Sequence, residues 1–327
     1  MDRHFIHFET PELARIVNDT APPTELDEVL IAVDHAGINR ADLLQRLGLY
    51  PPPEDASPIP GLEVAGRVVA VGEHCTSLKM GDRVCALTHG GGYASHAIAR
   101  EDHCLALPDN LSTEQGAALP EALLTVWYNV MERGQLSAGE TVLIHGGSSG
   151  IGSIGIQMAA ALGANVISTA GSAARCDAVK ALGASFVANH RESSLTAQFT
   201  DAGYVEQVDV ILDIAGGDLM QANLELAAPD GRIVCIGVMR GMQSEINLAT
   251  LFMKRLTLTG STLRRLNTAE RARCFTAVRE RIWPQVITGD IQPIVDTDYP
   301  LANVLEAHEH MRLGTHFGKL VLDCRMG

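Results

Sequence analysis

Several features that often identify a class of function are missing from this sequence. It contains no apolar run of 18 residues, so we expect no membrane-spanning helix. Positive charge is scarce, because 25 Lys and Arg residues stand against 39 Asp and Glu residues and the formal net charge is −14. A surface of this sign repels phosphate backbones and anionic lipids. Neither a nucleic acid nor a membrane is therefore an expected partner.

The cysteines do not form the pairs that a disulfide framework or a zinc cage requires. There are seven of them, an odd number, and no two are spaced as C-x-x-C, which favours buried or incidental thiols in a reducing compartment. The first residues also lack the apolar core of a signal peptide and the Arg and Ser bias of a transit peptide. We therefore expect a cytoplasmic protein.

The length and the order of patterns along the chain predict two domains of different architecture. The chain has 327 residues, of which 46% are hydrophobic, and this is enough for two folded cores. Up to about residue 110, short β-branched runs are interrupted by Gly, Pro and Asp, which indicates mainly β-structure. From about residue 119, apolar strands alternate with helices, which is typical of a parallel sheet covered on both faces. We expect its strands at 142–145, 166–169, 208–213, 232–236 and 256–261, a helical stretch over 268–288, and a last strand at 320–322 that returns to the β-rich part.

A glycine-rich turn, His145 to Gly152, lies between the first of these strands and an amphipathic helix. This is the context of a dinucleotide-binding turn. Glycines let backbone amides approach a pyrophosphate, and the helix N-terminus adds partial positive charge. The spacing departs from G-x-G-x-x-G, because Ser149 stands at the place of the middle glycine. A turn with only a packing role is the alternative, and the strand and helix around it favour cofactor binding.

The tip of the second strand indicates which dinucleotide is bound. In an NAD site an Asp or Glu at this place binds the ribose 2′-hydroxyl, whereas residues 169–175 read Thr-Ala-Gly-Ser-Ala-Ala-Arg. Arg175 would lie in the first turn of a helix, where a cation is unfavourable unless an anion is near. A 2′-phosphate would be that anion, so we expect NADPH, with Ser172 as a second donor. A solvated surface arginine is the alternative.

Six segments carry a resemblance to a known family, namely 36–42, 48–53, 60–66, 81–84, 118–122 and 147–152. Through them the chain resembles the medium-chain dehydrogenase/reductase superfamily, and within it the zinc-independent NADPH quinone oxidoreductase group, most closely its stress-inducible branch. The resemblance implies a GroES-like catalytic domain made of 1–120 and 265–327, a Rossmann domain at 121–264, NADPH as cofactor and a homodimer paired through the strand at 256–261.

The resemblance also implies a catalytic site without zinc. Zinc-dependent relatives have a cysteine where this chain has Asn39 and a histidine where it has Leu62, next to a retained Glu63. No group of histidines shows a ligand-like spacing, so we expect no metal site. A carbonyl being reduced then needs another group to stabilise the developing oxyanion. Tyr50 is the expected donor of a hydrogen bond or proton, or else a wall of the site, and Asn39 is a second donor or else caps a turn.

These residues predict an enzyme that transfers hydride from NADPH to a small molecule, a quinone or a conjugated enone. A 2-alkenal or enoyl reductase, and a non-catalytic NADPH-binding protein, stay open as alternatives. His190 follows a further strand, the third of six expected in the Rossmann domain, and is either a phosphate contact or a surface histidine. The expected cofactor-binding residues are Thr125, Gly147, Ser148, Ser149, Gly150, Ile151, Gly152, Gly171, Ser172, Arg175, His190, Ala215, Gly216, Ile236 and Gly237.

Overall fold

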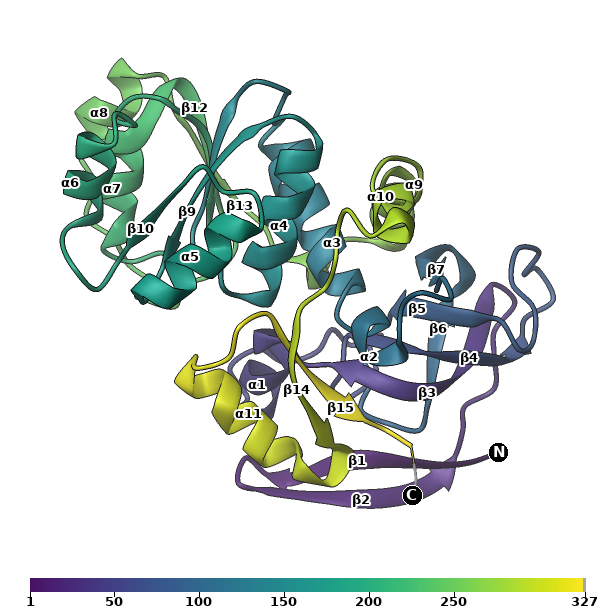
Figure 1. Ribbon diagram of the computed structural model, residues 1–327. Helices are drawn as coiled ribbons and strands as arrows, with labels where there is room; N and C mark the ends of the chain where they lie inside the picture. Colours follow the sequence, from purple (N-terminus) through teal and green to yellow (C-terminus); the bar gives the residue numbers. More distant parts are fainter. Residues whose placement is uncertain (326–327) are drawn as a thin grey trace. The chain divides into compact units, whose positions relative to one another are not determined.

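The computed structural model describes residues 1–325, and the chain divides into two compact units (Figure 1). Unit 1 contains Met1–Ala122, Thr268–Ile287 and the chain from Pro293 onward. Unit 2 contains Leu123–Asn267 and Thr288–Gln292. The two ends of the sequence therefore fold together, and the middle of the sequence folds separately.

Unit 1 is built on a seven-stranded sheet in the order β14-β15-β3-β4-β5-β7, with β6 paired to β3. The β-branched residues of β3 are buried, as expected for a strand at the centre of a sheet. The C-terminal strand β15 lies parallel to β14 and antiparallel to β3, which confirms the predicted return of the chain. The strands are β3 Glu28–Gly37, β4 Glu63–Val71, β5 Arg83–Leu87, β6 His96–Arg100, β7 Cys104–Ala106, β14 Val295–Pro300 and β15 Lys319–Asp323.

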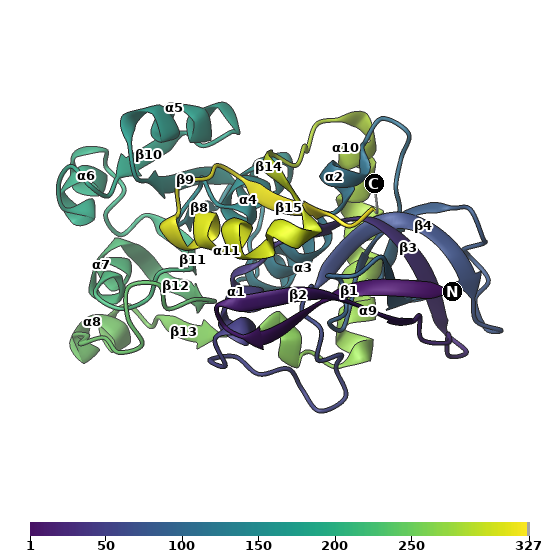
Figure 2. The ribbon, with the colours of Figure 1, turned by 90° about the horizontal axis from the view of Figure 1, so that it is seen from below.

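A separate antiparallel ribbon of β1 Asp2–Thr10 and β2 Leu13–Thr20 also belongs to unit 1 (Figure 2). The helices of unit 1 are α1 Arg40–Arg46, α2 Thr113–Gly116, α9 Thr268–Arg281 and α11 Val304–Leu313, with 3-10 turns at Glu101–His103 and Leu301–Asn303. Two helices, α3 Pro120–Val126 and α10 Trp283–Thr288, have residues in both units, and the 3-10 turn Leu263–Arg265 belongs to unit 2. The expected helical stretch over 268–288 is two helices. Pro284 has no amide hydrogen to donate to the preceding turn, so the hydrogen bonding of a single helix is interrupted there.

Unit 2 contains a six-stranded parallel sheet in the order β10-β9-β8-β11-β12-β13. The chain runs outward from β8 in one direction and then from β11 in the other, which is the doubly wound topology with its switch point between β8 and β11. The predicted α/β class, a GroES-like β domain with a Rossmann domain, is confirmed. The strands are β8 Thr141–Ile144, β9 Asn165–Ala170, β10 Phe186–Asn189, β11 Val208–Asp213, β12 Ala227–Cys235 and β13 Thr257–Gly260.

Two helices of unit 2 have clear local signals at their ends. Ser172 is the N-cap of α5 and its hydroxyl accepts from the Arg175 amide. Gly163 and Gly183 follow α4 and α5 with φ angles of +84° and +114°, which favour glycine over any other residue. The helices are α4 Gly150–Ala161, α5 Ala173–Ala181, α6 Leu195–Asp201, α7 Leu219–Leu226 and α8 Leu248–Met253, and Trp127–Arg133 is a π-helix. None of the helices within residues 1–325 is long and apolar enough to cross a lipid bilayer.

Candidate functional site

The glycine-rich turn leaves the sheet of unit 2 at the carboxyl end of β8. Gly146 has a φ of +69°, and the Gly147 amide donates to Thr169 O on β9 at 2.9 Å. Ser149 is the N-cap of the twelve-residue helix α4, and its hydroxyl accepts from the Gly152 amide at 3.0 Å. The turn therefore places the N-terminus of α4 at the switch point of the sheet, where doubly wound folds bind ligands.

A side chain at either Gly147 or Gly152 would block this turn. A Cβ atom on Gly147 would lie 2.3 Å from Ser168 Oγ, and one on Gly152 would lie 2.3 Å from Gly146 O. The amides in the first turn of a helix have no intrahelical acceptor, and the helix dipole adds partial positive charge. Ser148 and Ile151 are partly exposed beside them. The residues present therefore fit a pyrophosphate.

A buried chain of hydrogen bonds holds the turn to two neighbouring strand ends. Asp213 Oδ2 accepts from Asn223 Nδ2 at 3.0 Å, and Asn223 Oδ1 lies 2.8 Å from His145 Nε2. Burial lowers the pKa of His145, so the neutral ring donates from Nε2 and accepts at Nδ1. The Thr169 hydroxyl, 3.3 Å from Nδ1, is then the donor, and its oxygen accepts from the Gly146 amide at 3.0 Å.

The same aspartate shapes the loop after β11. Asp213 Oδ1 accepts from the amides of Ala215 and Gly216 at 2.7 and 2.9 Å. The Ile236 amide donates to Asp213 O, and a Cβ on Gly237 would lie 2.3 Å from Ile214 O. The four expected residues at the ends of β11 and β12 therefore form one compact pair of loops. Asp213, His145 and Asn223 act as positioning residues for them.

Positively charged and polar groups gather at the end of β9. A Cβ on Gly171 would lie 3.1 Å from His190 Nε2 and 3.5 Å from Arg191 Nε, so both side chains lie beside this glycine. Ser172 is exposed and Arg175 partly exposed. Burial, with the charges of Arg191 and Arg175 among others, lowers the pKa of His190. The two arginines beside this histidine suit an anionic group.

The expected contact at Thr125 lies on the last turn of α3, within unit 2. Thr125 is buried, with 8% of its surface exposed, and its carbonyl accepts from Asn129 Nδ2 at 2.8 Å. The neighbouring Val126 packs on Gly155 of α4, where a Cβ would lie 3.2 Å from its Cγ2. This packing fixes the end of α3 against the helix that follows the glycine-rich turn.

In unit 1, Asn39 lies in a buried polar group at the N-terminus of α1. Its Nδ2 donates to Glu63 Oε1 at 2.8 Å, and its Oδ1 accepts from Lys319 Nζ at 2.7 Å. Its amide donates to Asp42 Oδ2 at 2.8 Å. Lys319 also forms a buried ion pair with Glu63. Asn39 therefore occupies the N-cap position of α1, and its side chain is held in one orientation by Glu63 and Lys319.

Tyr50 lies in the loop that follows α1. Its amide donates to Leu44 O at 3.2 Å, which closes the loop on the helix. The side chain is partly exposed, and Pro51–Pro53 stiffen the chain that follows. Its catalytic role stays a prediction, as does that of Asn39.

Several residues that shape the site gave no usable signal in the sequence. Lys319 meets Asn39 and Glu63 only because β15 joins β3 in the sheet. Arg191 and His145 are adjacent to expected residues, but the sequence did not indicate that their side chains contact the other strand ends. Asn223 lies on α7, away from any motif.

Two family models match this chain. The alcohol dehydrogenase GroES-like domain matches residues 25–109, and the zinc-binding dehydrogenase family matches residues 150–279. The zinc-binding dehydrogenase match covers residues 150–279 and does not include Asn39 or Leu62. The family description therefore does not show that these two positions bind zinc.

Whole-chain comparisons agree with these matches. The quinone oxidoreductase of Sus scrofa is 34% identical over 320 residues, which span 96% of this chain and 95% of the relative. The structure of Escherichia coli quinone oxidoreductase complexed with NADPH aligns at 29% identity with a TM-score of 0.83, over 99% of this chain and 100% of that chain. CurK enoyl reductase has the same fold, with a TM-score of 0.83 at 24% identity over 98% of this chain and 99% of that chain. With a relative of this identity along nearly its whole length, the chain belongs to the quinone oxidoreductase family of the medium-chain dehydrogenases/reductases.

Proposed function

We propose that this chain is an NADPH-dependent reductase that passes hydride to a quinone without the help of zinc. The observation that carries the proposal is the cluster at the end of β9. Ser172, Arg175, His190 and Arg191 lie at or near Gly171, and residues 169–175 contain no carboxylate for a ribose 2′-hydroxyl. The family and the NADPH complex of the Escherichia coli relative support the same cofactor.

The chain's own residues would hold the cofactor at two places. The amides at the start of α4 would bind the pyrophosphate, with the Asp213–Asn223–His145–Thr169 hydrogen bonds keeping the turn in shape. Arg175 and Ser172 would bind the 2′-phosphate, because an arginine offers charge-assisted hydrogen bonds to phosphate oxygens. When bound, NADPH supplies the hydride from its nicotinamide ring.

The buried ion pair in unit 1 supports a reaction without zinc. Glu63 is the acidic residue retained from the zinc-dependent relatives, and both of its oxygens are engaged. Oε1 accepts from Asn39 and Lys319, and Oε2 accepts from the Glu121 amide at 2.9 Å. Lys319 thus supplies the positive charge that this carboxylate needs. Tyr50 is then the proposed donor to the acceptor oxygen, on which hydride transfer leaves negative charge.

The experiment that tests the proposal measures steady-state NADPH oxidation with 1,2-quinones, 1,4-quinones and conjugated enones, after treatment with a chelator. We expect the highest kcat/KM with a quinone and no loss of turnover after chelation. Loss of turnover that zinc restores, in a chain that stays folded after chelation, would contradict the zinc-independent site.

The second candidate is a 2-alkenal or enoyl reductase, and the shared fold of CurK enoyl reductase favours keeping it in the test. A conjugated enone reduced with a kcat/KM well above that of every quinone would support this candidate. Saturable NADPH binding without turnover of any acceptor would instead indicate a non-catalytic NADPH-binding protein.

We also propose a homodimer formed through β13. Among the described strands β13 pairs with β12 alone, so it is an edge strand of the sheet. Its Leu258 is 41% exposed, and Phe252 and Met253 of the preceding helix α8 are 65% and 72% exposed. An apolar edge strand of this kind is an aggregation hazard unless it is paired, and pairing with a second copy gives a closed two-fold dimer.

A further inference from the structure

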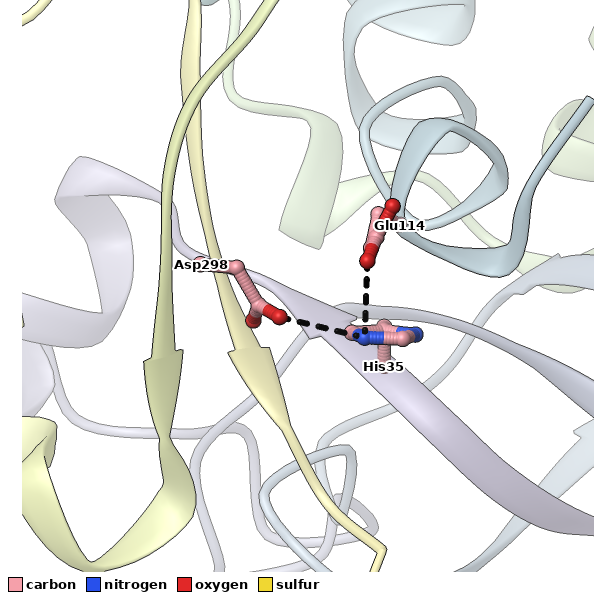
Figure 3. A group of neighbouring side chains, drawn as sticks. All are labelled: His35, Glu114 and Asp298. Atoms are coloured by element: carbon pink, nitrogen blue, oxygen red, sulfur yellow. Dashed lines mark ion pairs between the residues drawn. The ribbon is translucent and has the colours of Figure 1, made fainter.

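Three potential metal ligands from separate elements of unit 1 meet over its sheet (Figure 3). His35 lies on β3, Glu114 on α2 and Asp298 on β14. Each offers one ligand atom, and the three atoms lie within 4.8 Å of one another. Neither the proposed reaction nor the expected cofactor site uses any of these residues.

The His35 ring is buried and oriented, with one nitrogen left for a ligand. Its side chain is 1% exposed, and Nδ1 bonds the Thr113 hydroxyl at 2.9 Å. This contact turns Nε2 toward the two carboxylates, as Figure 3 shows. Nε2 is buried without a hydrogen-bond partner, because Asp298 Oδ2 and Glu114 Oε1 are 3.5 and 3.8 Å away. A buried polar atom in this state indicates a missing partner.

The spacing of the three atoms fits a single ion between them. With metal–ligand bonds of about 2.0–2.2 Å, neighbouring ligands of a tetrahedral site lie about 3.3–3.6 Å apart. The two distances from His35 Nε2 are close to that range. The side chains of Glu114 and Asp298 are 43% and 33% exposed, so an ion can enter from solvent and water can complete its coordination.

The charges around the cluster also favour a cation. Asp323 lies opposite His35 in the β15–β3 register, and its carboxylate pairs with Arg325 at 2.7 Å. The ligand oxygens of Glu114 and Asp298 also lie within 4.8 Å of each other, so the two carboxylates repel each other when both are charged. A divalent ion would offset this repulsion between carboxylates.

We propose that His35, Glu114 and Asp298 form a binding site for a divalent transition-metal ion, with Zn²⁺ as its occupant. One imidazole nitrogen and two carboxylate oxygens suit Zn²⁺, whereas Mg²⁺ and Ca²⁺ prefer oxygen ligands alone. The ion would tie β3 and α2 to β14 of the C-terminal segment, so its role is to stabilise unit 1. The sequence predicts no such site, because 79 residues separate the first two ligands and 184 the last two.

The test uses the untagged full chain, freed of metal by a chelator and dialysed. Zn²⁺ is titrated by calorimetry, and Co²⁺ is added as a probe whose visible absorption reports ligation. Asp298→Asn and Glu114→Gln keep the size of each side chain and remove its charge. His74→Ala is the matched control, since His74 is an exposed histidine that pairs with Asp27 at 3.0 Å.

We expect the wild type to bind one Zn²⁺ per chain, with a Kd of about 10 μM or tighter. Each carboxylate variant should bind at least about tenfold more weakly, as expected for the loss of a ligand, and His74→Ala should bind as the wild type does. At a Zn²⁺ concentration near the wild-type Kd, the Tm of the wild type and of His74→Ala should rise clearly more than that of Asp298→Asn, because stabilisation follows binding to the folded state.

Two results would overturn the proposal. One is no Zn²⁺ binding by the wild type at about 1 mM metal, which is about a hundredfold above the expected Kd. The other is equal affinity in the wild type and both carboxylate variants, which would assign the metal to other histidines. In either case the cluster is a histidine–carboxylate ion group, and Asp298→Asn should change the Tm equally with and without Zn²⁺.

Discussion

Lys319 Nζ donates to Asn39 Oδ1 at 2.7 Å, although 280 residues separate the two in sequence. The same ammonium donates to Ile38 O at 3.2 Å and pairs with the buried Glu63. The C-terminal strand β15 thereby supplies the charge that neutralises Glu63. It also fixes the orientation of the Asn39 amide, which the sequence offered as a second donor beside Tyr50.

The first prediction concerns the stability of this ion pair. Lys319→Met should lower the free energy of unfolding by about 3–5 kcal/mol, because it leaves Glu63 buried without its counter-charge. Urea unfolding at neutral pH measures this. The double variant Glu63→Gln with Lys319→Met removes both charges and should recover much of the loss. A single variant as stable as the wild type would show that Glu63 needs no partner.

The second prediction concerns the 2′-phosphate. Arg175→Ala should raise the Kd for NADPH by about 10- to 100-fold, because it removes a charge-assisted hydrogen bond worth about 1.5–3 kcal/mol. NADH binding should hardly change, because NADH lacks the phosphate. Calorimetric titration of both cofactors measures the difference. Lys180→Ala, on the last turn of the same helix, is the control, and an equal loss for NADPH and NADH would give Arg175 another role.

The third prediction concerns Tyr50. If its phenol stabilises the forming oxyanion, Tyr50→Phe should keep NADPH affinity and lower the rate of hydride transfer by about 10²-fold. The effect should be larger with an enone than with a quinone, because a quinone is the more reactive acceptor. Single-turnover NADPH oxidation measures this step without product release. Unchanged rates with both acceptors would leave Tyr50 only as a wall of the site.

The fourth prediction concerns assembly. Light scattering at micromolar concentration should give the mass of a dimer. Leu258→Lys should shift the protein toward monomer, since a charged residue on an edge strand opposes pairing. Leu313→Lys replaces an exposed leucine, 57% exposed, at the end of α11 in unit 1 and should leave the dimer intact. A monomeric wild type would contradict the proposed pairing.

The fifth prediction concerns acid stability. Burial lowers the pKa of His308 to about 3, whereas an unfolded histidine titrates near pH ~6.5. Between these two pKa values only the unfolded chain binds the proton of this histidine. As the pH is lowered from about 6 to about 3, His308 therefore lowers the free energy of unfolding by about 1.4 kcal/mol per pH unit. His308→Gln should therefore lose stability less steeply as the pH falls, as measured by urea unfolding. His74→Gln, at an exposed histidine, is the control and should show the same dependence of stability on pH as the wild type. If His308→Gln shows that same dependence too, His308 is not a source of the loss of stability in acid.

The features that could be predicted from the sequence were those with a local signal. The glycines at 147–152 lie between a strand and a helix, and Ser172 and Gly183 mark the ends of α5. The break between α9 and α10 also has a local cause, Pro284, but the spacing of apolar residues over 268–288 predicted one continuous helix. The Lys319–Glu63 pair and the His145–Asn223 bond had no such signal, because sheet order and long loops bring these residues together. The His35 cluster depends in the same way on β15 joining β3.

Cofactor preference in turnover tests the central claim most directly, namely that this chain is an NADPH-dependent quinone reductase. The measurement is kcat/KM for NADPH and for NADH with one quinone acceptor, using the chelator-treated enzyme. Since Arg175 is proposed to bind a phosphate that NADH lacks, we predict a preference for NADPH of at least about tenfold. Equal or better use of NADH, or no turnover of the quinone with either cofactor, would contradict the claim.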